Sequence, residues 1–359
     1  MSKSGRRIVH DTEGLNTGDW PVATADDFIT PVDKFFTRSH APVPAIDPAE
    51  WRLAVGGLVD RPASFSLEEL TRGFPERTVP ATLVCAGLRR DEYLATGPLP
   101  GELPWGPEPV SNGEWTGVAL ADLLRAVGVS GSARHVGFVG LDAVERHGQR
   151  FGFGGSIDLE KAMGSEVLLA TRINGVTLPS VHGFPLRAVV PGWIGAKSVK
   201  WLGHIDLLAK PSDNYFQSKA YRVQREVDAR DPRDVSAGVA MSAVPLNAVI
   251  LDPAPGQAVE VGSVRVRGWA MGSACRPLTK VELSPDGGQR WVPARITREG
   301  GPWTWSVWEA TVDLGPGTHT LAARATDNSG ATQPATVDET WNVKGYGNNA
   351  WHRLTITAR

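Results

Sequence analysis

The two halves of this chain use different aromatic residues, and no other feature of the sequence constrains its architecture as strongly. All 10 phenylalanines lie at or before Phe216, whereas 7 of the 13 tryptophans follow Trp201. One continuous core would mix both residue types along the chain, so the sequence predicts two separate cores. The length of 359 residues agrees with this prediction, because it is roughly twice that of a usual domain.

The second half reads as an antiparallel β-sandwich of immunoglobulin type. Runs that alternate apolar and polar residues, separated by Gly, Pro, Asn and Asp, predict strands at 248–251, 264–270, 280–284, 303–310 and 318–326. About seven strands at this spacing are typical of such a sandwich. The preceding segment 228–245 is charged and then rich in small residues, which indicates a linker. We therefore expect an N-terminal arm at 1–34, a catalytic domain at 35–235 and a sandwich at 236–359.

The first domain has the pattern of a mixed α/β fold, so the predicted class of the whole chain is α+β. Helices are expected at 66–72, 120–127 and 159–163, and strands at 52–55, 82–84, 135–139, 167–170 and 186–190. The segment 97–113 is rich in Gly and Pro and predicts long loops. Long ordered loops on a compact scaffold are where binding and catalytic residues gather.

The charge balance excludes several classes of partner. Lys and Arg number 37 against 39 Asp and Glu, a net charge of −2. Neither nucleic acid nor an anionic membrane is expected as a partner, so any anion site must be local. No apolar run approaches the ~18 residues of a membrane span. The N-terminal basic residues have no apolar stretch behind them, so we expect a cytoplasmic location, or a periplasmic one if a leader has been removed.

Three segments carry side chains suited to chemistry. Cys85 ends a strand-like run and is followed by Gly and two arginines, whose charge favours the thiolate that binds metals. His182, Arg187, Lys197 and Lys200 lie in a Gly-rich apolar stretch and could cradle a buried polyanion. Arg38 and His40 are two residues apart and share one side of an extended segment. The alternatives are a buried structural cysteine and a strand pair with exposed cations.

Taken together, these segments resemble the sulfite oxidase family of molybdenum-cofactor enzymes. The resemblance runs from about Phe35 to Arg353. It rests on the stretches FFTRSHAPVP, CAGLRR, WTGV, GLD, HGFPLRAVVPGWIGAKSVKWL and WNVKGYGNNAWHR, with Trp105 between the second and the third.

The resemblance implies specific roles for residues of this chain. Cys85 would be the single protein ligand of molybdenum, completed by the dithiolene sulfurs of molybdopterin. The residues implied to bind the cofactor are Arg38, His40, Asp142, His182, Arg187, Ser198, Val199 and Lys200. Those implied to surround the substrate are Arg38, Arg90, Trp105, Tyr221 and Lys344.

The implied reaction is the oxidation of sulfite to sulfate by oxo transfer. The 34 residues before Phe35 are too few for a haem-binding domain, so no haem is expected in this chain and the electrons would pass to cytochrome c or oxygen. The sandwich resembles the family's dimerisation domain, which implies a homodimer.

Three positions depart from the family pattern and bear on substrate identity. Leu88 and Ser39 stand where Asn is usual, and Lys344 stands where sulfite oxidases usually carry Arg. A nitrate or sulfoxide reductase on the same scaffold is therefore an alternative. Two further alternatives are a binding protein without cofactor and an enzyme that uses Cys85 as a nucleophile with His182 or His40.

Overall fold

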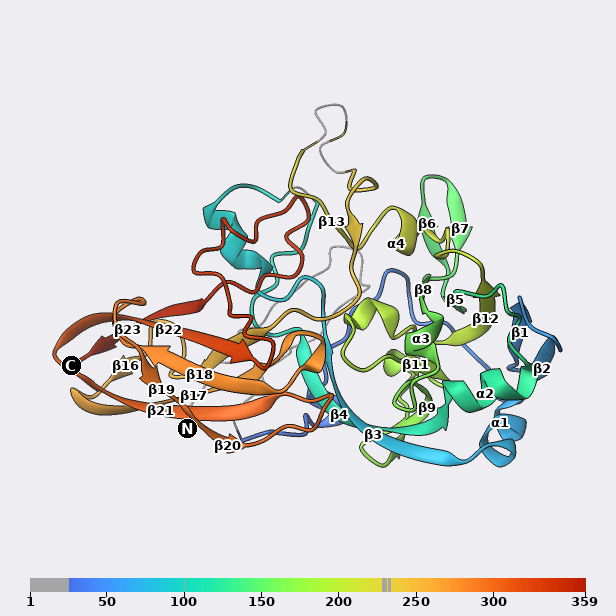
Figure 1. Cartoon of the computed structure of the whole chain (residues 1–359), viewed down its shortest axis with the longest axis horizontal. Coiled ribbons are helices and arrows are strands. Elements are labelled where there is room, and N and C mark those ends of the chain that lie inside the picture. The colour runs from blue at the N-terminus through green and yellow to red at the C-terminus, as the bar shows by residue number, and fades with distance from the viewer. Residues whose placement is uncertain (1–25, 100, 228–230, 232–233) are drawn as a thin grey trace.

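The computed structural model describes residues 26–99, 101–227, 231 and 234–359. Most of the expected N-terminal arm lies outside the described residues. The chain forms a mixed α/β domain followed by an all-β domain (Figure 1), as the sequence predicts. No helix of the described chain is long and apolar enough to cross a membrane.

One mixed sheet and one antiparallel sheet form the first domain. The first has the order β2-β1-β12-β5-β8, with β1 and β12 parallel. Its strands are β1 (Leu53–Gly57), β2 (Ala63–Phe65), β5 (His135–Gly140), β8 (Gly154–Asp158) and β12 (Leu202–Leu208). The second has the order β10-β9-β4-β3, and β11 pairs with β9. Its strands are β3 (Glu76–Val84), β4 (Val110–Ala119), β9 (Leu168–Ile173), β10 (Val176–Thr177) and β11 (Arg187–Val189). A small hairpin joins β6 (Val144–Arg146) and β7 (Gln149–Phe151).

The helices are short, and the three expected from the sequence are present. They are α1 (Leu67–Gly73), α2 (Leu120–Val127), α3 (Leu159–Ala162) and α4 (Tyr215–Ser218). Single 3₁₀ turns are η1 (Val32–Lys34), η2 (Arg90–Ala95), η3 (Ser180–His182), η4 (Gly195–Lys197) and η5 (Ser273–Cys275). Ser66 is not the first residue of α1 but its cap, because its hydroxyl accepts from the Glu69 amide while the Glu69 carboxylate accepts from the Ser66 amide.

Two strands of the second sheet differ from the expectation. β3 begins at Glu76 rather than at 82, and β4 occupies part of the segment expected to be loop. Pro80 lies within β3, where a proline argues against a strand. It is tolerated because β3 is at the edge of the sheet and pairs only with β4. In β4, Gly113 and the polar residues around it interrupt the alternation of apolar and polar residues by which a strand is recognised.

The second domain is the expected sandwich, with two sheets that enclose an apolar core. One sheet contains β15 (Asn247–Asp252), β17 (Gly262–Met271), β21 (Ser306–Leu314) and β20 (Arg295–Arg298). The other contains β16 (Ala258–Val259), β23 (His352–Ala358), β22 (Gly317–Asp327), β18 (Leu278–Ser284) and β19 (Val292–Pro293). The expected strands did not include β16, β19, β20 and β23, and the strand expected at 303–310 begins three residues before β21. Trp308 and Ile356 are fully buried between the sheets.

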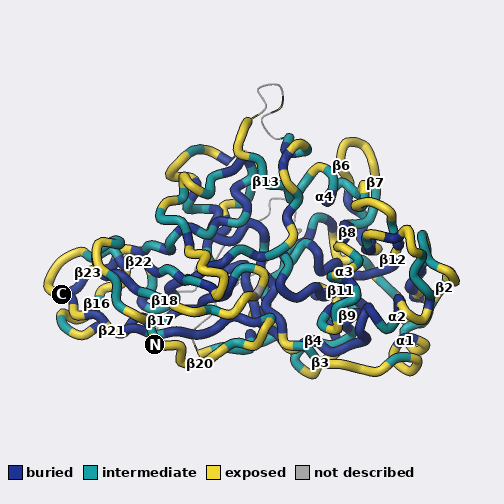
Figure 2. Tube along the Cα trace, in the orientation of Figure 1, coloured by how far each residue is buried: buried dark blue, intermediate teal, exposed yellow. Residues whose placement is uncertain are grey.

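The two domains are joined by an extensive junction. Beyond the first domain, β14 (Val239–Ala240) pairs back with β13 (Arg222–Val223), and the Val244 amide donates to the Gly192 carbonyl at 3.0 Å. The long segment between β22 and β23 also returns to the first domain and runs beside η2 (Figure 1). Figure 2 shows buried chain continuing through the middle of the molecule. The boundary at 235/236 stays a prediction, because residues on both sides of it pack together.

Candidate active site

A cavity in the first domain collects most of the residues singled out in the sequence. Its lining combines apolar rings such as Phe35 and Phe36 with charged side chains, a mixture typical of sites for small molecules and cofactors. Nine of the expected site residues line it: Arg38, His40, Cys85, Asp142, His182, Arg187, Ser198, Lys200 and Tyr221. They come from segments that are far apart in the sequence, so the cavity exists only in the folded chain.

Cys85 lies on the cavity wall because β3 ends immediately before it. The Cys85 amide donates to the Pro109 carbonyl at 2.9 Å, and its own carbonyl accepts from the Leu88 amide at 3.0 Å, which closes a turn. Gly87 is required in that turn, since a Cβ there would lie 2.7 Å from the guanidinium carbon of Arg90. The thiol is free and partly buried. The turn therefore presents one sulfur to the cavity.

Arg187 is a buried cation whose hydrogen bonds are incomplete. Its two terminal nitrogens donate to the carbonyls of His182 and Ser198 at 2.9 and 3.0 Å. Its Nε has no hydrogen-bond partner among the described residues. Burial lowers the pKa of Arg187 to about 9, because charge is costly away from water.

Lys200 is the second cation of the cavity, and it is partly buried. Its Nζ donates to the Ser39 hydroxyl at 2.7 Å and to the Val181 carbonyl at 3.1 Å. Burial, and then the charge of Arg187, lower the pKa of Lys200 to about 7, while Asp142 acts in the opposite direction. Among the described residues, no carboxylate forms an ion pair with either Lys200 or Arg187.

The two histidines of the cavity are neutral near pH 7. Burial lowers the pKa of His182 to about 4 and the pKa of His40 well below its ordinary value. His40 stacks on Phe153, with ring centroids 5.3 Å apart, and its Nε2 is 2.8 Å from the Tyr221 hydroxyl. The positive charge of the cavity therefore comes from arginine and lysine alone.

These properties fit a polyanionic cofactor whose metal takes one ligand from the chain. An anion would satisfy the orphaned Nε of Arg187 and stabilise the protonated form of Lys200. No cluster of three or more His, Cys, Asp or Glu that could hold a metal occurs in the described part of the chain. A metal in this cavity would therefore take the Cys85 thiolate and complete its coordination from the cofactor.

An open groove adjoins the cavity and shares Arg38, His40 and Tyr221 with it. Lys344, from the segment that returns from the sandwich, also lines this groove. Its Nζ lies 3.0 Å from a carboxylate oxygen of Glu102.

Three of the residues expected at the active site line neither the cavity nor the groove. Arg90 is buried behind the groove, with its guanidinium carbon 5.0 Å from the ring centroid of Tyr346. Trp105 and Val199 are each only 1% exposed, and neither lines the cavity or the groove.

The sequence did not indicate several residues of the groove, among them Glu102 and Tyr346. Glu102 follows Gly101 in a loop that no periodic pattern distinguishes. Tyr346 lies within a family stretch, but the wall it occupies forms only when the two domains meet. The only sequence signal for Tyr346 as a groove residue is its position two residues after Lys344.

Comparisons with known proteins agree with this site. The molybdopterin binding domain model of oxidoreductases matches residues 40–216, and the Mo-co oxidoreductase dimerisation domain model matches residues 239–359. The chain is 38% identical to sulfite oxidase of Gallus gallus, over 92% of this chain and 73% of that protein. It is 35% identical to sulfite oxidase of Arabidopsis thaliana, over 97% of this chain and 93% of that protein.

A solved structure and a second class of relative were also found. The crystal structure of the sulfane dehydrogenase SoxCD from Paracoccus pantotrophus matches with a TM-score of 0.76 and 27% identity, over 92% of this chain and 84% of that one. A nitrate reductase of Brassica napus is 35% identical over 91% of this chain but only 38% of its own length. The two family models match the chain in the same order as its two domains, and this chain matches sulfite oxidases over most of their length. The chain therefore belongs to the sulfite oxidase family of molybdopterin oxidoreductases.

Proposed function

We infer that this protein oxidises sulfite to sulfate at a molybdenum–molybdopterin centre in the cavity of the first domain. One observation carries the inference: a single partly buried thiol faces the same cavity as the buried Arg187 and the partly buried Lys200, two cations without a carboxylate partner among the described residues. A cofactor with a phosphate and sulfur ligands suits this combination of groups. The sulfite oxidase relatives support the same reaction.

Within this proposal, the chain's own residues hold the cofactor and exclude water. Cys85 is the single protein ligand of the metal, and Arg187 and Lys200 bind the phosphate, with His40, Asp142, His182 and Ser198 around the pterin. Val199 contributes through its backbone, since its carbonyl accepts from the Ala188 amide and keeps the flanking Ser198 and Lys200 in place. When bound, the molybdenum centre supplies two-electron oxo transfer to the sulfur of sulfite.

The substrate oxyanion binds where the groove meets the cavity. Arg38, which lines both the groove and the cavity, and Lys344, which lines the groove, offer charge-assisted hydrogen bonds to its oxygens. Burial raises the pKa of Tyr221 above its ordinary range, so its hydroxyl keeps its proton. The hydrogen bond between that hydroxyl and His40 fixes its orientation toward the anion. Trp105 is buried in the loop that also carries Glu102, and its carbonyl accepts from the Asp91 amide at 2.9 Å.

The proposal extends to the electron acceptor, the compartment and the oligomeric state. We propose that cytochrome c or oxygen accepts the electrons, and that the protein acts in the cytoplasm as a homodimer. The match to a dimerisation domain supports the homodimer.

The decisive experiment combines metal analysis with an acceptor assay. Purified protein should contain molybdenum in an amount equimolar with the chain, and sulfite should reduce cytochrome c or consume oxygen in its presence. Nitrate, tested with a reduced dye as electron donor, is the control substrate. Protein that contains molybdenum but turns over nitrate and not sulfite would replace the proposed reaction by the reductive one.

A further inference from the structure

Glu102 pairs with two cations, Lys344 in the substrate groove and Arg90 behind it. One carboxylate oxygen lies 3.0 Å from the Nζ of Lys344, and the other lies 3.3 Å from a terminal nitrogen of Arg90. The three side chains are 17%, 15% and 5% exposed, respectively. This is a largely desolvated cluster, unlike the surface ion pairs that contribute little.

The backbone keeps Glu102 in this place. Its loop connects η2 to β4, and the guanidinium of Arg90 also donates to the Leu103 carbonyl at 3.1 Å. The Nε of Arg90 donates to the Gly345 carbonyl at 3.2 Å. Gly345 has a φ of +57°, and a Cβ there would lie 2.9 Å from the Cγ of Arg90. One arginine therefore ties the Glu102 loop to the Lys344 segment.

The Glu102 carboxylate also faces the groove that leads to the cavity. Glu102 lines this groove together with Lys344, Tyr221 and Tyr346. Burial raises the pKa of Tyr346 well above its ordinary value, and the charge of Glu102 is the next cause. The carboxylate is thus close enough to act on groups that surround the place where an oxyanion binds.

We propose that Glu102 is an internal anion that competes with the bound oxyanion for Lys344, and thereby sets the affinity of the site for sulfite and sulfate. One of its oxygens occupies Lys344, as an oxygen of a sulfite or sulfate ion would, while Arg90 behind the groove holds the other oxygen in place. This inference rests on the proposed function, because it concerns the same pocket. Glu102 is a specificity-determining residue in this view, and its charge favours release of the product anion.

The test is the variant Glu102→Gln, which keeps the side-chain size and removes the charge. Binding of inorganic sulfate to the molybdenum-containing protein, measured by titration calorimetry, should become roughly 10-fold tighter, as expected for freeing charge-assisted contacts. The KM for sulfite and the inhibition constant of sulfate should fall in parallel. Glu102→Asp keeps the charge and should behave more like the parent than like the Gln variant.

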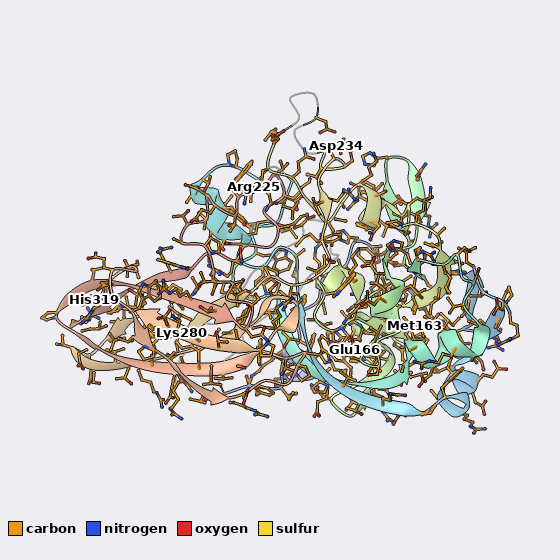
Figure 3. The ribbon with its side chains drawn as sticks, viewed as in Figure 1. Met163, Glu166, Arg225, Asp234, Lys280 and His319 are labelled. Carbon is orange, nitrogen blue, oxygen red and sulfur yellow. The ribbon has the colours of Figure 1, made fainter. Side chains whose placement is uncertain are left out.

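A matched control is available in the same domain. Glu166 pairs with Lys161 at 2.7 Å, with side chains 16% and 13% exposed, so this ion pair has nearly the same burial. Figure 3 shows Glu166 at the lower side of the molecule, whereas Asp234, a groove residue, lies at the upper side. Glu166→Gln should leave sulfate binding unchanged.

The remaining outcomes separate this inference from the proposed function. Sulfate binding in Glu102→Gln that is weaker than in the parent, or within twofold of it, rejects the role of Glu102. If the parent binds sulfate and the Gln variant binds it more tightly, but neither oxidises sulfite, the role of Glu102 stands and the proposed reaction fails. Should Glu102→Gln not fold, Glu102→Ala removes the same charge and must show the same tightening. In a Lys344→Met background the effect of Glu102→Gln should shrink, because the two residues are coupled.

Discussion

At the residue scale, the cavity is characterised by one buried and one partly buried cation, neither of which has a carboxylate partner among the described residues. A buried charge is costly unless an opposite charge or several hydrogen bonds compensate it. Arg187 has an unsatisfied Nε, and Lys200 has a pKa lowered to about 7. Such an arrangement persists in a native protein when a bound anion completes it. The inference that this cavity binds an anion therefore follows from the energetics of single side chains.

Cys85→Ser should abolish sulfite oxidation while the protein stays folded. A serine oxygen is a harder and less electron-donating ligand than a thiolate, so the reactivity of a bound molybdenum would change. Turnover, metal content and circular dichroism of the purified variant check this. Sulfite oxidation at the parent's rate would show that Cys85 is not the metal ligand.

Lys344→Met should raise the KM for sulfite roughly 10-fold, which corresponds to the loss of one charge-assisted contact. The low end of the usual range is expected because Glu102 already occupies Lys344 in part. Lys344→Arg should retain or lower the KM, since a guanidinium can bind two oxygens at once. Steady-state kinetics with added sulfate provide the measurement. Unchanged KM and sulfate inhibition in both variants would assign Lys344 a structural role only.

At the scale of elements, one buried histidine links two strands of the sandwich. The Nδ1 of His352 on β23 accepts a hydrogen bond from the Ile250 amide on β15 at 3.1 Å. Burial lowers the pKa of His352 to about 3. Protonation would remove this acceptor and place a charge in the sandwich. The contact between the two sheets is therefore sensitive to acid.

The contribution of His352 to the stability of the fold decreases as the pH falls. An unfolded chain protonates His352 below about pH 6.5, whereas the folded chain resists protonation until about pH 3. Its contribution to stability is complete above pH 6.5 and decreases as the pH falls from there, by about 2 kcal/mol at pH 5. In His352→Asn, an amide oxygen can replace Nδ1 without titrating. The difference in melting temperature between pH 7.5 and pH 5 should therefore be smaller in the variant than in the parent, and an equal difference would contradict this account.

At the scale of the whole molecule, the domain junction completes the active site. Lys344 and Tyr346 reach the groove only because the segment between β22 and β23 returns to the first domain. The Gly347 amide donates to the Ala86 carbonyl at 2.7 Å, next to the cysteine turn. Arg89 is fully buried and donates to the side chain of Asn247 at 2.7 Å. Movement of one domain against the other would thus change the substrate groove.

We expect a homodimer with a mass of about twice 38.5 kDa in light scattering at micromolar concentration. The interface should lie mainly on the sandwich, which matches the dimerisation domain and is rich in tryptophan, a residue enriched at interfaces. Cross-linking of a mixture of isotope-labelled and unlabelled protein identifies links between copies. These links should concentrate in 239–359, and a monomer, or links confined to the first domain, would overturn the expectation.

The sequence by itself determined the fold class, the main sandwich strands and three of the helices, because these depend on local patterns. The cysteine, histidine and basic stretches indicated six residues of the cavity, and the family resemblance implied Asp142, Ser198 and Tyr221 as well. Weakly patterned strands such as β4 and β23 escaped, since their pairing partners are distant in the chain.

Only the tertiary structure decided what Lys344 meets. Glu102 and Lys344 are far apart in the sequence, and neither lies in a pattern that indicates the other. Their 3.0 Å contact exists because the sandwich closes against the first domain and Arg90 ties their two loops together. A sequence can therefore supply the cations of an anion site, but the carboxylate that competes for them is set by the packing of one domain on another.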